Sequence, residues 1–236
     1  MEEGGEAAKV THVIFDLDGL LLDTEPVYTD ANTKTMAKYG KTFNLGIKVA
    51  TMGMKHDIAI DRMLEMVGLK GKVTVQEYSD YYDKILLEDL PNNKYLPGAM
   101  KLVKHLAAHK IPMAICTGSA RFEFDKKVQN HPELLDLIPL HVLTGSDPDV
   151  KLGKPAPDGY LVTMKRFPSP PKSPANVLVF EDAPNGVLSA VAAGMKVVMV
   201  PDFTYASPPK EVEDKITAVL NSLEEFKPES VGLPAY

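Results

Sequence analysis

Near its amino end the chain reads His12-Val13-Ile14-Phe15-Asp16-Leu17-Asp18-Gly19. The opening run, residues 12–15, is apolar, short and partly β-branched, which predicts a buried strand. Two aspartates one residue apart follow it directly, with a glycine behind them. Two ionised carboxylates repel each other by about 4 kcal/mol at ~4 Å and an effective dielectric of ~20, so a nearby cation is expected. A divalent metal with oxygen ligands is the natural candidate.

Composition and charge limit the kinds of partner. The chain has 236 residues, 44% hydrophobic and 25% charged, which is enough for one large domain or two small ones. Its net charge of −6 argues against nucleic-acid and anionic-membrane partners, because both recognise basic surfaces. The single cysteine, Cys116, lies in an apolar run and indicates a reducing compartment.

The sequence shows neither a signal-peptide pattern in residues 1–10 nor an apolar run approaching ~20 residues. We therefore expect a cytoplasmic protein without a membrane span. Its expected state is a monomer or a weak homodimer.

Residues 24–93 are predicted to form a helical insert. Apolar side chains recur at helical spacing in residues 25–39, 56–67 and 74–90, and no alternating strand pattern is convincing there. An insert of roughly 65 residues is large enough for a small helical bundle of its own. We therefore expect it to be a separate cap domain.

The remaining residues, 9–23 and 94–236, alternate between strand and helix patterns. Such alternation predicts an α/β core domain, with a Rossmann-like parallel sheet and helices on both faces. Ligands bind such sheets at the carboxyl ends of the strands. Strands are expected at 12–15, 111–116, 141–143, 177–180 and 197–200, and helices at 98–109, 120–130, 158–167 and 184–193.

Four polar clusters fall at the predicted strand ends or in adjoining loops. Each alone has an ordinary explanation, since Asp-Gly forms turns, Thr-Gly-Ser and Glu-Asp cap helices, and a lysine is usually a solvated charge. A parallel sheet would bring all four to one edge, however, and this coincidence favours a functional site. The clusters are Asp16-Leu17-Asp18-Gly19, Thr117-Gly118-Ser119, Gly153-Lys154-Pro155 and Glu181-Asp182.

These motifs, in this order, resemble those of the haloacid dehalogenase superfamily, and the resemblance covers essentially the whole chain. The helical insert directly after the first motif resembles the first-type cap of the phosphoglucomutase and phosphoglycolate phosphatase branch. More narrowly, the chain resembles the eukaryotic pseudouridine 5′-phosphatases and their glycerol-phosphate phosphatase relatives. That closer match is carried by Thr11–Asp16, Gly153–Asp158 and Leu178–Gly186.

The resemblance implies a role for each motif residue. Asp16 would be the nucleophile that forms an aspartyl-phosphate, and Asp18 the general acid and base. Thr117, with the backbone of Gly118, would bind the transferring phosphoryl oxygens, while Lys154 neutralises their charge.

A magnesium site is implied as well. Mg²⁺ would lie between the carboxylates of Asp16 and Asp182, the backbone carbonyl of Asp18 and a phosphate oxygen. Glu181 would belong to this metal site, where it either orients a metal-bound water or pairs with Lys154.

Specificity is expected to reside in the cap. The loop at residues 51–56 is interpreted as lying over the substrate, with Lys55 and His56 toward its distal polar groups, and a solvated loop is the competing interpretation. The leading hypothesis is a Mg²⁺-dependent phosphatase of a small phosphomonoester, such as pseudouridine 5′-phosphate or a sugar or polyol phosphate. A phosphoglucomutase-type phosphotransferase is the nearest alternative, and a non-catalytic binding protein the third.

Overall fold

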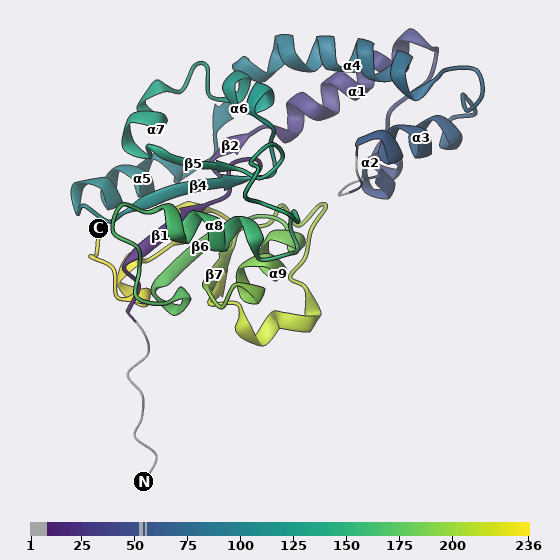
Figure 1. Ribbon diagram of the computed structural model, residues 1–236. Coiled ribbons are helices and arrows are strands. Elements are labelled where there is room, and N and C mark those ends of the chain that lie inside the picture. Colours follow the sequence, from purple (N-terminus) through teal and green to yellow (C-terminus); the bar gives the residue numbers. More distant parts are fainter. Residues whose placement is uncertain (1–8, 52–53, 55) are drawn as a thin grey trace. The chain divides into compact units, whose positions relative to one another are not determined.

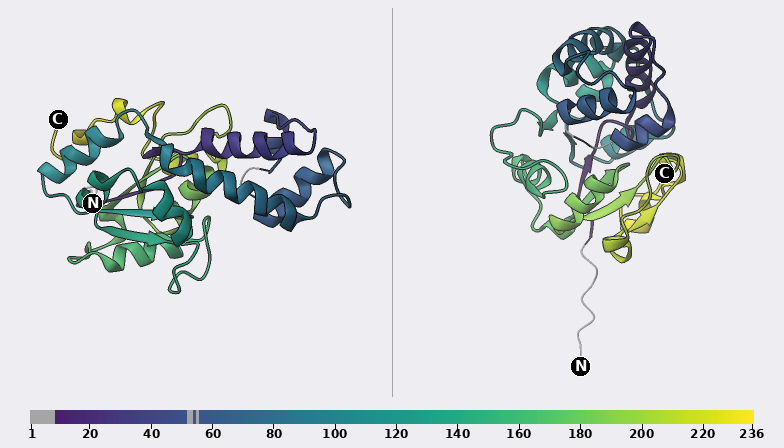
Figure 2. Two further views of the ribbon diagram at one scale, coloured as in Figure 1. Left: turned by 90° about the horizontal axis from the view of Figure 1, so that it is seen from above. Right: turned by 90° about the vertical axis from the view of Figure 1, so that its right-hand side faces the viewer.

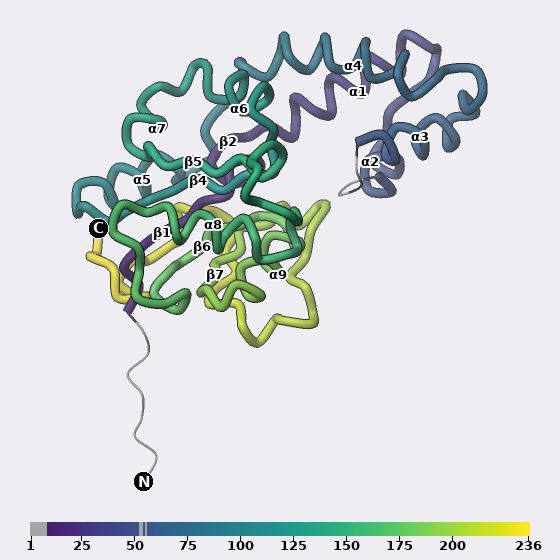
Figure 3. The backbone as a smooth tube through the Cα atoms, viewed as in Figure 1, coloured from purple at the N-terminus to yellow at the C-terminus, as the bar shows by residue number. Residues whose placement is uncertain are grey.

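The computed structural model describes residues 9–51, 54 and 56–236, which fall into two compact units. The first contains the described residues up to Asp23 together with Lys94–Tyr236, and the second is Thr24–Asn93. Figure 1 shows both, coloured along the chain, and Figure 3 traces the same backbone as a tube.

A six-stranded sheet forms the centre of the first unit as far as it is described, with strand order β5-β4-β1-β6-β7-β8. Each neighbouring pair is parallel, so the predicted parallel α/β core is confirmed. The strand β1 has β4 on one side and β6 on the other, which places its carboxyl end between theirs. The strands are β1 (His12–Phe15), β4 (Met113–Thr117), β5 (Leu140–Leu143), β6 (Val177–Glu181), β7 (Lys196–Met199) and β8 (Ala218–Val219).

Helices cover both faces of this sheet (Figures 1 and 2). Successive residues of a strand point to opposite faces. Accordingly, Val13 and Phe15 pack in one buried cluster with Leu102, whereas Ile14 packs in another with Tyr160. The helices are α5 (Ala99–Ala108), α6 (Arg121–Lys127) and α7 (Pro132–Leu137) on the first face, and α8 (Asp158–Arg166) and α9 (Pro184–Ala192) on the second.

The second unit is helical in its described residues. Its buried cluster joins Ala31 and Met36 of α1 to Leu64 of α3 and to Tyr78 and Leu86 of α4. A capping box starts α4, because the Thr74 hydroxyl accepts from the N–H of Glu77 and the Glu77 carboxylate accepts in return. The helices are α1 (Glu25–Lys38), α2 (Leu45–Thr51), α3 (His56–Met66) and α4 (Val75–Asp89).

Two short strands flank the insert in sequence and pair with each other. The strand β2 (Leu22–Asp23) runs antiparallel to β3 (Lys94–Tyr95), and both belong to the first unit. The chain therefore leaves the core and returns to it through one hydrogen-bonded ribbon. Short 3₁₀ helices are also present: η1 (Leu90–Asn92), η2 (Pro174–Asn176), η3 (Lys210–Lys215), η4 (Leu223–Glu225) and η5 (Pro228–Val231).

The structure departs from the expected elements in several places. The helix expected over 120–130 ends at Lys127, and a new helix begins at Pro132, since a proline disfavours helical geometry in the residue before it. The helices α2 and α7 and the three two-residue strands were not expected from the sequence, because they are too short to show a clear period. Of the helices formed by described residues, none combines the length and apolarity needed to cross a membrane.

Candidate active site

The carboxyl ends of β1, β4 and β6 bring the predicted motifs together. Phe15 is in register with Ile115 on one side and Phe180 on the other. The next residue, Asp16, donates its backbone N–H to the Phe180 carbonyl at 3.0 Å. Asp16 and Glu181 therefore stand side by side at the edge of the sheet, where ligands bind in parallel α/β folds.

Lys154 joins these two acidic side chains. Its Nζ atom donates to Oδ1 of Asp16 at 2.5 Å and to Oε1 of Glu181 at 2.6 Å. A third bond, at 3.2 Å, goes to the backbone carbonyl of Cys116. Although burial opposes it, the pKa of Lys154 is held well above its ordinary value by Asp16 and Glu181. The ammonium is therefore charged throughout the physiological range.

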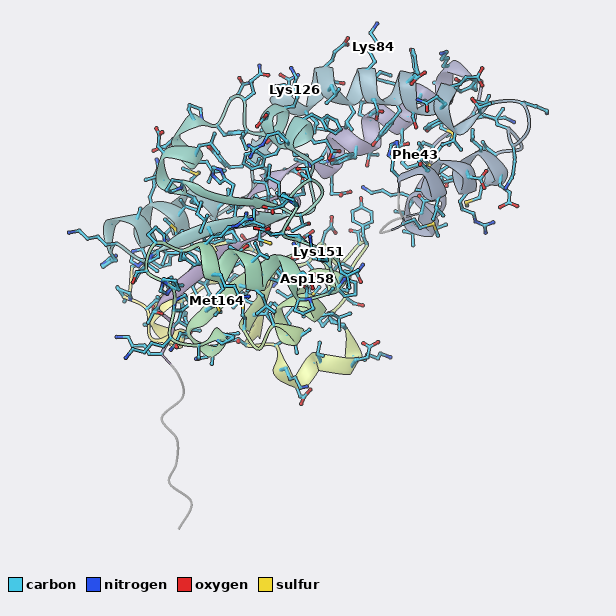
Figure 4. The ribbon with its side chains drawn as sticks, in the orientation of Figure 1. Phe43, Lys84, Lys126, Lys151, Asp158 and Met164 are labelled. Atoms are coloured by element: carbon cyan, nitrogen blue, oxygen red, sulfur yellow. The ribbon has the colours of Figure 1, made fainter. Side chains whose placement is uncertain are left out.

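The loop that carries Lys154 is fixed by its own hydrogen bonds. The Asp158 carboxylate at the start of α8 accepts from the backbone N–H groups of Lys151 and Leu152, at 3.2 and 3.1 Å. Figure 4 labels Lys151 and Asp158. Ser189 of α9 donates to the carbonyl of Ala156 at 2.7 Å. These bonds hold the loop on both sides of Lys154.

Glu181 is buried and held by several donors. Its Oε1 atom accepts from the Tyr160 hydroxyl at 2.6 Å, and its Oε2 atom accepts from the backbone N–H groups of Asp182 and Ala183, at 3.1 and 3.2 Å. A Cβ atom on Gly186 would lie 1.8 Å from Oε1 of Glu181. Only glycine at that position therefore leaves room for the carboxylate.

Among the described residues, Asp16, Glu181 and Asp182 form an acidic cluster whose ligand atoms lie within 4.8 Å of one another. Burial raises the pKa of Asp16 to about 7; Lys154 acts against this shift, and Glu181 and Asp18 add to it. Burial, followed by Glu181 and Asp16, also holds the pKa of Asp182 well above its ordinary value. One ammonium does not balance three carboxylates, and this set of oxygen donors fits a hard divalent cation.

Gly19 allows this cluster to be compact. It adopts φ +76°, a left-handed conformation that favours glycine. A Cβ atom there would lie 2.4 Å from Oδ2 of Asp182. The Asp-Gly pair therefore lets the backbone after Asp18 approach the carboxylate of Asp182 closely.

The Asp18 side chain makes a different set of contacts. Its Oδ1 atom lies 2.7 Å from Nζ of Lys127, and its Oδ2 atom accepts from the hydroxyls of Thr117 and Ser119, at 3.1 and 3.0 Å. Thr117 and Ser119 are buried, while Gly118 between them is exposed. The contacts of Asp18 thus come from the end of β4 and from α6.

Two residues of this arrangement could not be assigned a role from the sequence. Ser119 belongs to the motif Thr117-Gly118-Ser119, but the motif does not show which group its hydroxyl contacts. The sequence did not indicate that Lys127 is buried, because two adjacent lysines near the end of a helix usually lie on a solvated face. In the structure Lys127 is only 2% exposed, and burial of a lysine to this degree is rare without a paired charge.

The second unit contains a cavity of about 340 Å³. Lys55, expected near the substrate, lies outside the described residues, and His56 lines the cavity and shares a 3.1 Å hydrogen bond with Ser79. Lys48 also lines it and contacts Glu25 at 3.0 Å. Four aromatic rings contribute to the lining, those of Tyr28, Phe43, His56 and Tyr82, and Figure 4 labels Phe43.

Comparison with known proteins gives consistent matches. A model of haloacid dehalogenase-like hydrolases matches residues 10–194. The (DL)-glycerol-3-phosphatase 2 of Arabidopsis thaliana is 43% identical over 227 residues, covering 96% of this chain and 93% of the relative. The probable pseudouridine-5′-phosphatase of Drosophila melanogaster is 43% identical over 228 residues, covering 97% and 96% of the two chains.

Solved structures agree on the fold. A putative beta-phosphoglucomutase from Thermotoga maritima has a TM-score of 0.75 at 25% identity and covers 92% of this chain and 96% of its own. A hydrolase from Deinococcus radiodurans R1, with bound phosphate and sodium, has a TM-score of 0.78 at 22% identity and covers 97% and 100%.

Proposed function

Because the chain belongs to the haloacid dehalogenase-like hydrolase family, we propose that Asp16 and Asp18 perform a two-step phosphoryl transfer through an aspartyl-phosphate. The chain is a phosphoric monoester hydrolase that acts on small phosphomonoesters. One observation supports the mechanism above all. Asp16 stands at the end of β1 with its carboxylate on the Lys154 ammonium, inside a cluster that has too little positive charge.

In the first step Asp16 acts as the nucleophile. One of its carboxylate oxygens forms a bond to phosphorus, and the bond from phosphorus to the ester oxygen breaks. Lys154 holds Asp16 in place and balances charge on the phosphoryl oxygens. The Gly118 backbone would also bind these oxygens, and the Thr117 hydroxyl would turn from Asp18 to do the same. Asp18 donates a proton to the departing oxygen, which leaves as an alcohol.

In the second step Asp18 acts as the base. Its carboxylate takes a proton from water, and the water oxygen forms a bond to phosphorus. The bond between phosphorus and Asp16 then breaks, which releases inorganic phosphate and restores both side chains. The two aspartates therefore need different surroundings, and they have them: Asp16 contacts Lys154 and Asp18 contacts Lys127.

We propose Mg²⁺ as the cation of the acidic cluster. Its ligands would be the carboxylates of Asp16 and Asp182 and the backbone carbonyl of Asp18. When bound, the ion supplies positive charge to the phosphoryl oxygens and orients them. Both oxygens of Glu181 already accept hydrogen bonds from protein groups, so we assign Glu181 to holding Lys154 beside the metal.

The raised pKa of Asp16 predicts how Mg²⁺ stabilises the protein. Without the ion, the folded protein binds the Asp16 proton more tightly than the unfolded chain, so stability falls as pH rises from about 4 to about 7. Mg²⁺ replaces that proton and binds more tightly as pH rises. We expect the increase in Tm caused by Mg²⁺ to be at least about 3 °C larger at pH 8 than at pH 5.

Thermal unfolding with and without a chelator measures this difference, and the same samples report phosphate release. We expect the chelated enzyme to be inactive and Mg²⁺ to restore it. A Tm increase that is the same at both pH values would contradict the proposed ligand set.

For the substrate we propose a nucleoside 5′-monophosphate such as pseudouridine 5′-phosphate. The aromatic lining of the cavity in the second unit supports this choice, because stacking of a base on an aromatic side chain contributes roughly 1–3 kcal/mol. A polyol has no ring to stack. We therefore expect kcat/KM for pseudouridine 5′-phosphate to exceed that for glycerol 3-phosphate by at least about 10-fold.

Phe43→Ala tests the cavity directly. We expect this change to lower kcat/KM for pseudouridine 5′-phosphate by about 10-fold and to leave glycerol 3-phosphate within about twofold. Phosphate release from both substrates is the measurement. Equal losses would show that Phe43 does not recognise a base.

A phosphoglucomutase-type transferase remains the second candidate, favoured by the likeness to the putative beta-phosphoglucomutase. Incubation with a hexose 1-phosphate separates the two, since a mutase returns an isomer and a phosphatase returns free phosphate. A non-catalytic binding protein would release nothing from any substrate.

We further propose a cytoplasmic monomer or weak homodimer with no nucleic-acid or membrane partner. The net charge of −6 and the single, buried Cys116 support this proposal.

A further inference from the structure

Lys127 is a buried lysine that the proposed mechanism does not use. Its side chain is 2% exposed, and its Nζ atom lies 2.7 Å from Oδ1 of Asp18 and 2.7 Å from Oγ of Ser119. Its neighbour Lys126, labelled in Figure 4, is exposed and reaches Oε1 of Gln129 at 3.4 Å. Two adjacent lysines of α6 therefore have very different surroundings.

The hydrogen bonds around Asp18 form a consistent set of donors and acceptors. The Ser119 hydroxyl accepts from Lys127 and donates to Oδ2 of Asp18 at 3.0 Å. The Thr117 hydroxyl donates to the same oxygen at 3.1 Å and accepts from the backbone N–H of Ser119. With Lys127 on Oδ1, both carboxylate oxygens of Asp18 contact hydrogen-bond donors.

These contacts limit the rotation of the partly exposed Asp18 side chain. The Asp18 side chain is 25% exposed, whereas that of Asp16 is 9% exposed and packed against Lys154. An aspartate at the surface samples several rotamers, and each contact removes some of them. Proton transfer needs the carboxylate within about 2.6–3.2 Å of the leaving oxygen, so its orientation directly affects the rate.

We propose that Lys127 is a positioning residue, which, together with Ser119, fixes the Asp18 carboxylate in the orientation needed for proton transfer to the leaving group. This inference rests on the proposed role of Asp18 as general acid. Burying an ammonium is costly unless it is paired, so we expect Lys127 to keep its contacts with Asp18 and Ser119, also in the state in which Asp18 carries the proton that it donates.

Lys127→Met keeps the length of the side chain and removes its charge and hydrogen bonds. We compare kcat/KM for an alkyl monoester with kcat/KM for p-nitrophenyl phosphate, whose leaving group departs without a proton. The ratio kcat/KM reports only the first step, in which the aspartyl-phosphate forms. It does not depend on the later hydrolysis of that intermediate, which is the same for both substrates. We expect a loss of about 100-fold for the alkyl ester and less than about fivefold for the aryl ester.

Lys126→Met is the matched control, and we expect both rates to be unchanged. If Lys127→Met does not fold, as judged by circular dichroism, Ser119→Ala takes its place, because it retains both charges and removes the bridging hydroxyl. For Ser119→Ala we expect about a 10-fold loss on the alkyl ester and none on the aryl ester. Equal losses on the two substrates would indicate a purely structural role and overturn the proposal.

A double-mutant cycle separates this inference from the mechanism beneath it. If Lys127 acts through Asp18, then Asp18→Asn combined with Lys127→Met has the same kcat/KM on the alkyl ester as Asp18→Asn alone. Additive losses would overturn the positioning role. If instead Asp18→Asn alone keeps full activity on the alkyl ester, the proposed general acid is wrong, and the mechanism fails with it.

Discussion

Asp16→Asn is expected to lower kcat for phosphate release by roughly 10⁴-fold or more, because the amide oxygen is a far poorer nucleophile than the carboxylate it replaces. The surrounding site should survive the change. Lys154 keeps its 2.6 Å bond to Glu181, and an amide at position 16 accepts a hydrogen bond much as the carboxylate does.

Three measurements on this variant distinguish a lost nucleophile from a damaged fold. Acid-quenched wild-type enzyme should carry a phosphoryl group on Asp16 by mass spectrometry, and Asp16→Asn should carry none. Without metal, the Tm of the variant should equal or exceed that of the wild type, since burial disfavours the Asp16 carboxylate near neutral pH. The stabilisation by Mg²⁺ should be weakened. Normal phosphate release by Asp16→Asn would refute the mechanism.

Lys154→Met is expected to reduce both stability and activity. The Lys154 ammonium lies between Asp16 and Glu181, at 2.5 and 2.6 Å, and its removal leaves buried carboxylates without their compensating charge. Breaking a buried pair in this way typically costs 3–5 kcal/mol of unfolding free energy, which corresponds to about 10 °C in Tm. We also expect kcat to fall by at least about 100-fold, because the charge that balances the phosphoryl oxygens is lost.

The destabilisation should depend on pH in a defined direction. The pKa of Lys154 lies well above its ordinary value, so the lysine is charged throughout the range from pH 5 to pH 8, and the carboxylates set the dependence. Asp16, with its pKa near 7, is protonated at pH 5 and no longer needs a counter-charge. The difference in unfolding free energy between wild type and Lys154→Met should therefore be larger at pH 8 than at pH 5.

Urea unfolding at the two pH values in the presence of a chelator provides the measurement. Lys151→Met is the matched control, because Lys151 belongs to the same loop but is exposed, and surface changes of this kind usually stay within about 0.5 kcal/mol. A loss for Lys154→Met no larger than for Lys151→Met would show that the buried ion pair contributes nothing to stability.

The strands that carry the site could be predicted because their sequences are locally unambiguous. The apolar run before Asp16 gave β1 at its observed bounds, His12–Phe15, and the run before Glu181 gave β6 within one residue. The parallel sheet then followed from the alternation of elements, and with it the expectation that the strand ends meet at one edge. Local pattern and tertiary packing agree in this part of the chain.

The partners of Asp18 could not be predicted, because the information is not local. Lys126 and Lys127 are adjacent lysines of one helix, yet one is exposed and the other nearly completely buried. The difference arises from how α6 packs on β4, which brings position 127 toward Ser119 and leaves position 126 in solvent. Only the assembled fold reveals which lysine contacts Asp18.

Because β2 and β3 pair with each other at its two ends, the helical insert can be changed or replaced without altering the core. Asp23 and Lys94 are direct partners in that antiparallel ribbon, so the 70 residues between them form the connection of a single hairpin. Closing a longer loop costs little additional entropy, since the cost grows only with the logarithm of its length. Insertions, deletions or complete replacement of the residues between these two can therefore accumulate without shifting the register of any strand that carries the proposed catalytic groups.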